Sequence, residues 1–373
     1  MITTTTLLSI PTTLPALSHL WAETLGSPDI CIAVLDGTIE QAHPCFKGAD
    51  LSCIETLVSI QGSQQPDSQH GTHIASIIFG QHSSSVLGVA PSCRGLLIPI
   101  FASEVGNFLT PCSQLDLARA ITQAVEQGAN VINISGGQLA ASAESDRLLA
   151  NAVRLCQENN VLIVAAAGND GCDCLHIPAA LESVLAVGAM DNRENPFGFS
   201  NWGEAYQSQG ILALGENILG AIPGGGTALK TGTSFATAIV SGVVALLLSI
   251  QLQRGEKPDP LAIRDAILQS ALPCTQSKNI DNRRCLVGTL NIPGAYALIT
   301  KGEIKSMSNE KSGETMLQSS ESDNPIEQVS IDEAINLGLE QAIPQSLAIG
   351  VQAAEAKPST PTAISMGASP MIV

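Results

Sequence analysis

The stretch from Thr231 to Gln253 contains no charged side chain and constrains the fold most strongly. It begins with a polar, glycine-rich segment that includes Ser234 and continues into a strongly apolar run. A membrane span is one interpretation, but small and hydroxylated residues interrupt the run, and its strictly apolar part is too short to cross a bilayer. We therefore expect a helix that is buried through the middle of a soluble domain.

Ser234 lies where the predicted turn becomes this helix. Backbone N–H groups at a helix start are unpaired, and the helix dipole favours negative charge there. A nucleophilic serine would benefit from that position. An ordinary N-cap serine explains this stretch alone equally well.

The composition narrows the class of protein. A chain of 373 residues with 45% hydrophobic and 14% charged residues is typical of a folded protein of one large or two ordinary domains. Its net charge of −17 disfavours nucleic acid or an anionic membrane as a partner. No Lys or Arg precedes Lys47, so a secretory signal is not indicated, and we expect a cytoplasmic protein. Its ten cysteines are then expected to be free thiols, although the spacing leaves a Cys274–Cys285 bridge open.

Apolar segments of strand length alternate with helical patterns. The first segment spans 30–35 and ends at Asp36. Further strands are expected at 95–100, 131–135, 161–167 and 184–188, with helices at 113–127 and 146–159. This alternation predicts an α/β fold with a parallel sheet and right-handed crossovers. Asp36 would lie at the C-terminal end of a central strand, where catalytic groups gather, unless it only forms an Asp-Gly turn.

Three segments are expected along the chain. Residues 1–28 form an N-terminal surface segment whose apolar patch at 14–25 packs on the domain. Residues 29–300 form the packed domain. Residues 301–373 have the composition of a flexible linker or tail, with a weak amphipathic helix at 331–354, and are expected to lead into a further domain.

Two groups of side chains suggest metal ligands, but neither is convincing. His70 and His73 are three residues apart at a predicted helix start, yet no Glu accompanies them in the metalloprotease pattern. Cys172, Cys174 and His176 lack a fourth ligand for a closed zinc site. We expect a buried structural His73 and reduced thiols at Cys172 and Cys174, with a disulfide to a distant cysteine as the next interpretation. No metal and no cofactor are expected.

Asp36, His70 and Ser234 together supply what a nucleophilic serine requires. A hydroxyl needs an imidazole to accept its proton, and the imidazole needs a carboxylate to fix its tautomer. Asn169 follows an apolar strand and offers an amide for the oxyanion, together with the backbone N–H of Ser234.

These motifs resemble those of subtilisin-family serine proteases. The four blocks around Asp36, His70, Asn169 and Ser234 occur in the family order and cover roughly residues 15–300. The resemblance implies a three-layer fold with a central parallel sheet, helices on both faces and a buried nucleophile helix. It also makes His70, rather than His73, the catalytic base.

The resemblance further implies a cleft that binds the substrate as an added strand. Its matching residues are Ser135, Gly136, Gly137, Ala166 and Gly168. The alignment also puts His176 near the floor of the specificity pocket. A polar floor would disfavour large aromatic side chains.

Within the family, residues 20–26, 132–139 and 168–180 resemble the leader-cleaving proteases of cyanobactin biosynthesis. That group carries no pro-domain and has a further C-terminal region. The chain departs from the wider family at Ala238, where a proline is usual, and at Cys45 and 81–85, where many members bind calcium. Calcium needs several oxygen ligands, so we expect that site to be lost.

The sequence therefore predicts a serine endopeptidase that cleaves the leader from a ribosomally made precursor peptide, with a small polar residue before the cut. An intracellular subtilase of broad specificity is the first alternative. A peptide-binding module that keeps the fold without the chemistry is the second. A nucleotide-binding protein is remote, because no glycine-rich phosphate motif follows the first strand.

Overall fold

The computed structural model describes residues 15–56, 69–103, 109–110, 112–274, 281–301 and 363–364. The helices are α2 (Pro15–Glu23), η1 (Pro44–Phe46), α4 (Gln69–Phe79), α5 (Gln114–Glu126), α6 (Arg147–Glu158), α7 (Tyr206–Gln209), α8 (Thr233–Gln253), α9 (Pro260–Ser270), η2 (Asn282–Cys285) and α10 (Ile292–Lys301). The strands are β1 (Cys31–Gly37), β2 (Leu51–Cys53), β3 (Arg94–Ser103), β4 (Leu109–Thr110), β5 (Cys112–Ser113), β6 (Val131–Ile134), β7 (Gln138–Ala140), β8 (Leu162–Ala166), β9 (Leu175–Ile177), β10 (Leu185–Met190), β11 (Gly210–Leu214), β12 (Ile218–Ile222), β13 (Gly226–Lys230) and β14 (Ala363–Ile364).

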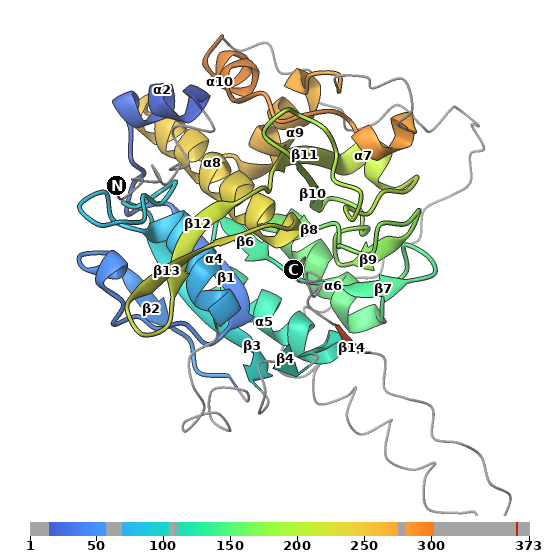
Figure 1. The fold of residues 1–373 in the computed structure, drawn as a ribbon, viewed down its shortest axis with the longest axis horizontal. Helices are drawn as coiled ribbons and strands as arrows, with labels where there is room; N and C mark the ends of the chain where they lie inside the picture. Colours follow the sequence, from blue (N-terminus) through green and yellow to red (C-terminus); the bar gives the residue numbers. More distant parts are fainter. Residues whose placement is uncertain are drawn as a thin grey trace, which may run out of the picture. The chain divides into compact units, whose positions relative to one another are not determined.

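A parallel sheet forms the centre of the fold (Figure 1). Its strand order is β11-β10-β8-β6-β1-β3-β2, and β4 adds to β3 in the antiparallel direction. β1 lies between β6 and β3, with Val34 opposite Asn133 on one side and Leu97 on the other. The predicted α/β fold with a central parallel sheet is confirmed.

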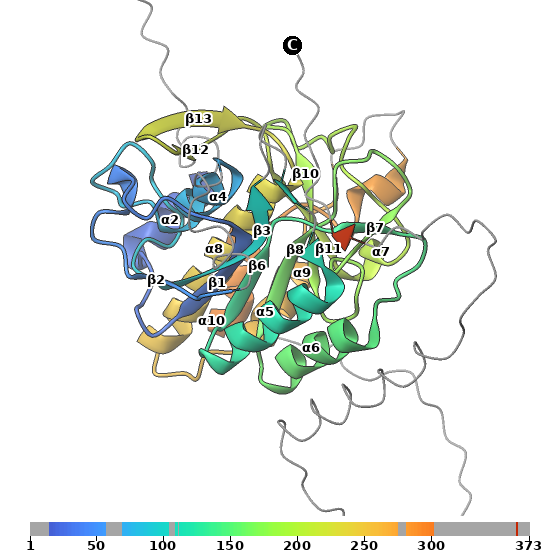
Figure 2. The ribbon, with the colours of Figure 1, turned by 90° about the horizontal axis from the view of Figure 1, so that it is seen from below.

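The sheet separates two hydrophobic cores because successive side chains of a strand point to opposite faces. Ile32 and Val34 of β1 pack with residues of α4, α8, α9 and α10 on one face. Cys31, Ala33 and Leu35 pack with residues of α5 and α6 on the other. Figure 2 shows α5 and α6 side by side beneath the strands. Helices on both faces give the three layers that were predicted.

α8 is the buried helix predicted from the uncharged stretch. It is apolar and long enough to cross a membrane by composition, but 94% of its most apolar window is buried inside the protein. Gly242 permits close packing, because a Cβ there would lie 2.5 Å from the Cβ of Val89. α8 is therefore a core helix, and Ser234 is held at its start by the packing of the whole domain.

α2 attaches the N-terminal segment to the domain. Leu17 and Leu20 are buried in the core, and the Trp21 indole N–H donates to the carbonyl oxygen of Val89 over 2.8 Å. The apolar patch thus packs on the domain as expected. The segment boundaries remain predictions, and the helix expected at 331–354 lies outside the described residues.

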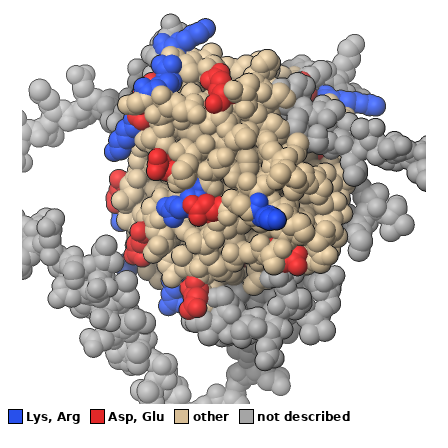
Figure 3. Space-filling view, turned by 90° about the vertical axis from the view of Figure 1, so that its left-hand side faces the viewer, with Lys and Arg blue, Asp and Glu red and all other residues tan. Residues whose placement is uncertain are grey.

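The surface drawn in Figure 3 carries acidic and basic side chains close to one another. Among the residues described on this face, neither sign forms a continuous patch. Charges of both signs in alternation are typical of a solvated protein surface.

Candidate active site

Asp36 and His70 form a hydrogen-bonded pair at the C-terminal end of β1. Asp36 is fully buried, and His70 Nδ1 lies 2.9 Å from its Oδ1 and 3.0 Å from its Oδ2. The Gly37 N–H also donates to Asp36 Oδ1 over 2.7 Å. A carboxylate held in this way keeps the proton of a neutral imidazole on Nδ1 and leaves Nε2 free to accept another.

Gly71 permits the close approach of α4 to β1 that brings His70 to Asp36. A Cβ at Gly71 would lie 2.6 Å from the carbonyl oxygen of Gly37 and 3.0 Å from that of Thr38. Any larger residue would push the helix start away from the strand. The glycine that follows His70 in the sequence therefore has a physical role in the pair's geometry.

Ser234 is the second residue of α8, and the N-cap position belongs to Gly232. The N-cap interpretation of Ser234 is therefore wrong. Its hydroxyl donates instead to the carbonyl oxygen of Ser135 over 3.0 Å. The neighbouring Phe235 ring lies 5.8 Å from the His70 ring, centroid to centroid, and a site shared by Ser234 and His70 remains a prediction.

Asn169 is fixed against the start of α8 through its side-chain oxygen. Oδ1 accepts hydrogen bonds from the backbone N–H and the hydroxyl of Thr233, both at 3.0 Å. Because both Thr233 groups are donors, the side-chain atom that faces them must be the amide oxygen. The amide –NH₂ of Asn169 therefore points away from Thr233. An amide donor held at the start of α8 fits the oxyanion role that the sequence predicts for Asn169, and that role remains a prediction.

His73 is buried within α4, as the sequence indicated. Its Nε2 lies 3.1 Å from the carbonyl oxygen of Ala228, and its ring packs on Gly220. Burial, together with the nearby charge of Lys230, lowers the pKa of His73 to about 3. A histidine that is buried and stays neutral in this way is a structural residue.

His176 lies on β9 between two of the predicted cleft segments. It is 2% exposed, and Cβ atoms built on Gly137 and Gly168 would lie 3.0 and 2.7 Å from its Nδ1. Its Nε2 lies 2.7 Å from Oδ2 of Asp170, a residue that the sequence did not single out. The structure thus places His176 beside both glycine segments, although the role of the pocket residues remains a prediction.

The expectation of reduced thiols at Cys172 and Cys174 is wrong in this structure. The two cysteines form a disulfide with each other, and Cys274 forms another with Cys285. The expectation of reduced thiols at Cys172 and Cys174 came from the predicted compartment. The Cys274–Cys285 bridge is the one that the sequence spacing left open. Sulfurs that are bonded to each other do not act as thiolate ligands, so Cys172 and Cys174 are not zinc ligands here.

An ion pair connects the segments that carry the two disulfides. Arg283, next to the Cys285 end, donates to Asp173 over 2.8 Å, and Asp173 lies between Cys172 and Cys174. Arg283 also stacks on the Trp202 ring, 4.4 Å from its centroid. These contacts fix the segment that leads from Asn169 to His176. A sequence pattern gives no signal for such a contact, because its partners are more than one hundred residues apart.

The positions where related proteins bind calcium are tied to other groups. The Gln81 backbone N–H donates to the Cys45 carbonyl, and the Gln81 side-chain amide donates to the carbonyls of Phe79 and Pro91. The His82 ring packs edge-on against Trp21. Cys45 offers no carboxylate oxygen at the first of these positions, and the loss of the calcium site remains our prediction.

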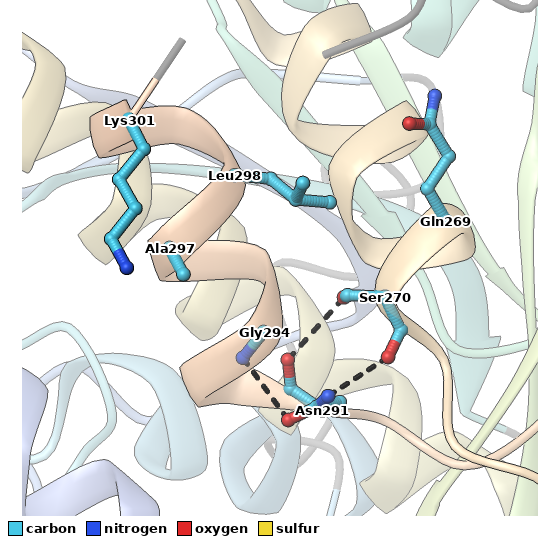
Figure 4. A pocket seen from close by; sticks show the side chains of 7 residues that line it. All are labelled: Gln269, Ser270, Asn291, Gly294, Ala297, Leu298 and Lys301. Atoms are coloured by element: carbon cyan, nitrogen blue, oxygen red, sulfur yellow. Dashed lines mark hydrogen bonds between the residues drawn. The ribbon is translucent and has the colours of Figure 1, made fainter. Parts of the chain in front are cut away.

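A separate hollow of about 370 Å³ lies between α9 and α10 (Figure 4). It is lined by Gln269, Ser270, Asn291, Gly294, Ala297, Leu298 and Lys301. The Asn291 side chain is engaged by the Ser270 carbonyl and the Gly294 N–H. These groups stabilise the contact between the two helices, and none of them belongs to the constellation at α8.

The family model of the subtilase family matches residues 27–325 of the chain. The chain therefore belongs to the subtilase family. It is 32% identical over 255 residues to the thermophilic serine proteinase of Bacillus sp. (strain AK1), a match that covers 68% of this chain and 59% of that protein. It is also 32% identical over 243 residues to the major intracellular serine protease of Bacillus subtilis (strain 168), covering 62% and 72%. The chain thus spans about three fifths of the length of the first relative.

Solved structures are more similar. The prenylagaramide maturation protease PagA is 58% identical, with a TM-score of 0.72 over 77% of this chain and 99% of PagA. A mutant of the protease domain of PatA is 57% identical, with a TM-score of 0.70 over 75% and 98%. The PatG macrocyclase in complex with peptide is 34% identical, with a TM-score of 0.70 over 79% and 98%. The predicted resemblance to subtilisins, and within them to the cyanobactin maturation proteases, is confirmed.

Proposed function

We propose that this chain removes the leader from a ribosomally synthesised precursor peptide of the cyanobactin type. One observation carries the proposal: 57–58% identity over nearly the whole length of the maturation proteases PagA and PatA, against 34% to the PatG macrocyclase. At comparable coverage, this difference favours peptide-bond hydrolysis over ring closure.

The chemistry would proceed through an acyl-enzyme. Ser234 Oγ attacks the carbonyl carbon before the cut, and His70 Nε2 takes the hydroxyl proton. Asp36 holds the His70 tautomer and stabilises the imidazolium that forms. The Asn169 amide and the Ser234 backbone N–H stabilise the oxyanion. His70 then returns the proton to the leaving amine, and water releases the acyl group by the same steps in reverse order.

The substrate would bind as an extended strand. Backbone groups of Ser135, Gly136 and Gly137 line one side of it, and those of Ala166 and Gly168 line the other. Main-chain hydrogen bonds then give affinity, and the pocket beside His176 selects a small polar residue before the cut. The partner is thus a peptide, and we expect neither nucleic acid nor a membrane to take part. The enzyme would act in the cytoplasm, where ribosomal precursors are made.

Mass spectrometry of a precursor peptide incubated with the enzyme tests the proposal, with Ser234→Ala as the matched control. One cut between leader and core, absent with Ser234→Ala and unaffected by calcium chelation, is the expected result. The released core should be linear, heavier than a macrocycle by one water. Scattered cuts that also occur in casein would support the subtilase of broad specificity. No cut and no labelling by an active-site serine reagent would support the non-catalytic module.

A further inference from the structure

The strand β14, near the C-terminus of the chain, lies beside the proposed substrate cleft. It pairs with β5 in the antiparallel direction, with Ala363 opposite Ser113 and Ile364 opposite Cys112. It also lies against β7, the strand that follows directly after Gly137 (Figures 1 and 2). β14 belongs to the same compact unit as both strands. A segment of the tail is thus next to the surface where an extended peptide is proposed to bind.

β5 offers backbone groups to an extended partner. Among the described strands, β14 is the only one that pairs with β5. A strand with an unpaired edge accepts an added strand through main-chain hydrogen bonds. β5 is itself fixed, because Ser113 is the N-cap of α5 and its hydroxyl accepts a hydrogen bond from the Asp116 N–H over 3.1 Å.

A hydrogen bond fixes β5 and β7 relative to each other. Gln114 follows β5 directly, and its Nε2 donates to Oε1 of Gln138, the first residue of β7, over 3.0 Å. Gln114 Oε1 accepts from the Asp146 N–H over 2.8 Å. Both glutamine side chains belong to buried residues. The surface formed by β5 and β7 is therefore preformed, which lowers the cost of binding a strand there.

β7 lies on the leader side of the proposed cut. Leu139 of β7 is opposite His176 in the β7–β9 pair, and the pocket beside His176 is proposed to hold the residue before the cut. Ser135, whose carbonyl oxygen accepts from the Ser234 hydroxyl, comes three positions before Gln138, which corresponds to about 10 Å of extended chain. β14 therefore lies where the leader would pass, away from Ser234.

The composition of the tail suits this surface. The sequence after Lys357 contains no charged side chain. Leu139 of β7 is 53% exposed, and Leu115 in the first turn of α5 is 40% exposed. Exposed apolar side chains next to a strand edge favour an uncharged extended segment over a charged one.

We propose that β14 occupies the leader side of the substrate cleft of its own chain, so that the tail competes with the peptide substrate for β5 and β7. Because one chain carries both partners, dilution of the enzyme does not weaken the competition. The apparent affinity for substrate falls with the fraction of enzyme whose surface is free. This inference rests on the proposed function for where the peptide binds, and not for which peptide it is.

Ala363→Pro/Ile364→Pro in the full chain tests the competition. Proline has no N–H and cannot donate a hydrogen bond to β5. We expect KM for a leader–core peptide to fall about 3–10-fold at unchanged kcat, because the substrate no longer displaces a bound strand. Ala353→Pro/Ala354→Pro, in the same tail but outside β14, is the matched control and should keep the native KM. Equal KM in the native chain and the β14 variant would overturn the proposal.

Two further measurements separate this competition from other causes. Phenylmethylsulfonyl fluoride is too small to reach from Ser234 to β7, so it should label the native chain and the β14 variant at equal rates. Unequal labelling would show that the substitutions alter the catalytic site and would overturn the proposal. The native KM should also be independent of enzyme concentration. A KM that rises with enzyme concentration would assign β14 to a second copy of the chain and overturn competition within one molecule.

A cross-link tests the position of β14 without kinetics. Residues directly opposite in an antiparallel pair have Cα atoms about 4.5–5.5 Å apart, a distance that a disulfide can bridge. Ile364→Cys should therefore form a disulfide with Cys112 under a mild oxidant, identified by mass spectrometry of a digest, and Ala353→Cys should not. Cross-linking to Cys112 in neither variant, or equally in both, would overturn the proposal.

The cross-linked chain also reports on activity. At subsaturating peptide it should cut about 10-fold or more slowly than the uncross-linked variant, and dithiothreitol should restore the rate, with the native chain treated in the same way as the control. Precursor processing is a separate outcome. If the enzyme cuts casein at many sites and the β14 variant lowers KM for a casein fragment, the proposed function fails and this inference stands. If the precursor is cut once and KM is equal in both chains, this inference fails and the proposed function stands.

Discussion

Ser234 and Ser135 exchange two hydrogen bonds. The Ser234 hydroxyl donates to the Ser135 carbonyl oxygen, and the Ser135 hydroxyl donates to the Ser234 carbonyl oxygen, both over 3.0 Å. This reciprocal pair joins the start of α8 to the end of β6. It also engages the hydroxyl of Ser234, the proposed nucleophile, with an acceptor other than His70, so the hydroxyl must rotate before it reacts. A substrate strand that donates to the Ser135 carbonyl would compete for this acceptor and release the hydroxyl.

Ser135→Ala keeps the carbonyl but removes the bond to the Ser234 backbone. It also leaves the Asn133 amide without its acceptor at 3.0 Å. We expect a loss of about 1–3 kcal/mol in the free energy of unfolding and a roughly 10-fold loss in kcat/KM, measured by urea denaturation and peptide kinetics. Ser249→Ala is the control, because that hydroxyl bonds within α8, to Ala245, and contacts the Cys93 thiol. Equal kinetics in Ser135→Ala and the native chain would contradict a positioning role.

Asn169→Asp separates the two ends of the Asn169 side chain. The new carboxylate keeps an oxygen for Thr233 but lacks the –NH₂ donor and brings negative charge to the oxyanion. We expect kcat to fall about 10²–10³-fold, the loss found when one such donor is removed from subtilisin, with little change in KM. Single-turnover kinetics on a leader–core peptide measure it. A change confined to KM would instead assign Asn169 to substrate binding.

The sequence identifies the groups whose chemistry demands a residue type. Asp36, His70 and Ser234 are recognisable because each meets a definite chemical requirement. Asp36 offers a carboxylate at the end of a strand, His70 offers an imidazole at the start of one helix, and Ser234 offers a hydroxyl at the start of another helix. The uncharged run after Ser234 likewise predicts that α8 is buried, since a helix that is apolar on all sides is stable in a soluble domain only in the interior. The structure places these residues on the predicted strand and helices, and their catalytic roles remain predictions.

Contacts between distant segments are not recognisable in this way. The Ser135–Ser234 exchange depends on how β6 and α8 pack against each other, which periodicity does not encode. The Cys172–Cys174 bridge was missed for another reason, since the expectation came from the presumed compartment and not from the distance between the two residues. Backbone conformation decides whether two thiols meet.

His73 makes the stability of the fold depend on pH. Its pKa in the folded protein is lowered to about 3 by burial, whereas the unfolded chain titrates near the ordinary value of 6.5. Between these values the unfolded state binds more protons, so the free energy of unfolding falls as the pH drops from 6.5 toward 3, by up to about 1.4 kcal/mol per pH unit. His73→Gln should flatten this part of the profile, as measured by urea midpoints from about pH 7 down to about 4.5. A variant profile parallel to that of the native chain would show that His73 is not the cause.

The Cys274–Cys285 bridge should contribute measurably to stability. It closes a segment with a sequence separation of 11, and the restriction of the unfolded chain corresponds to about 3 kcal/mol. We expect Cys274→Ser/Cys285→Ser to unfold at lower urea, and reductant to lower the midpoint of the native chain but not that of the double variant.

Cys172→Ser/Cys174→Ser is the matched control for that experiment. Its bridge spans a sequence separation of 2 and restricts the unfolded chain far less, so the same pair of substitutions should shift the midpoint little. Free thiols at all four positions, found by mass spectrometry after alkylation of the native protein, would contradict both bridges. Because Asp173 and Arg283 join the two disulfides, a large shift in both double variants would show instead that the bridges act as one unit.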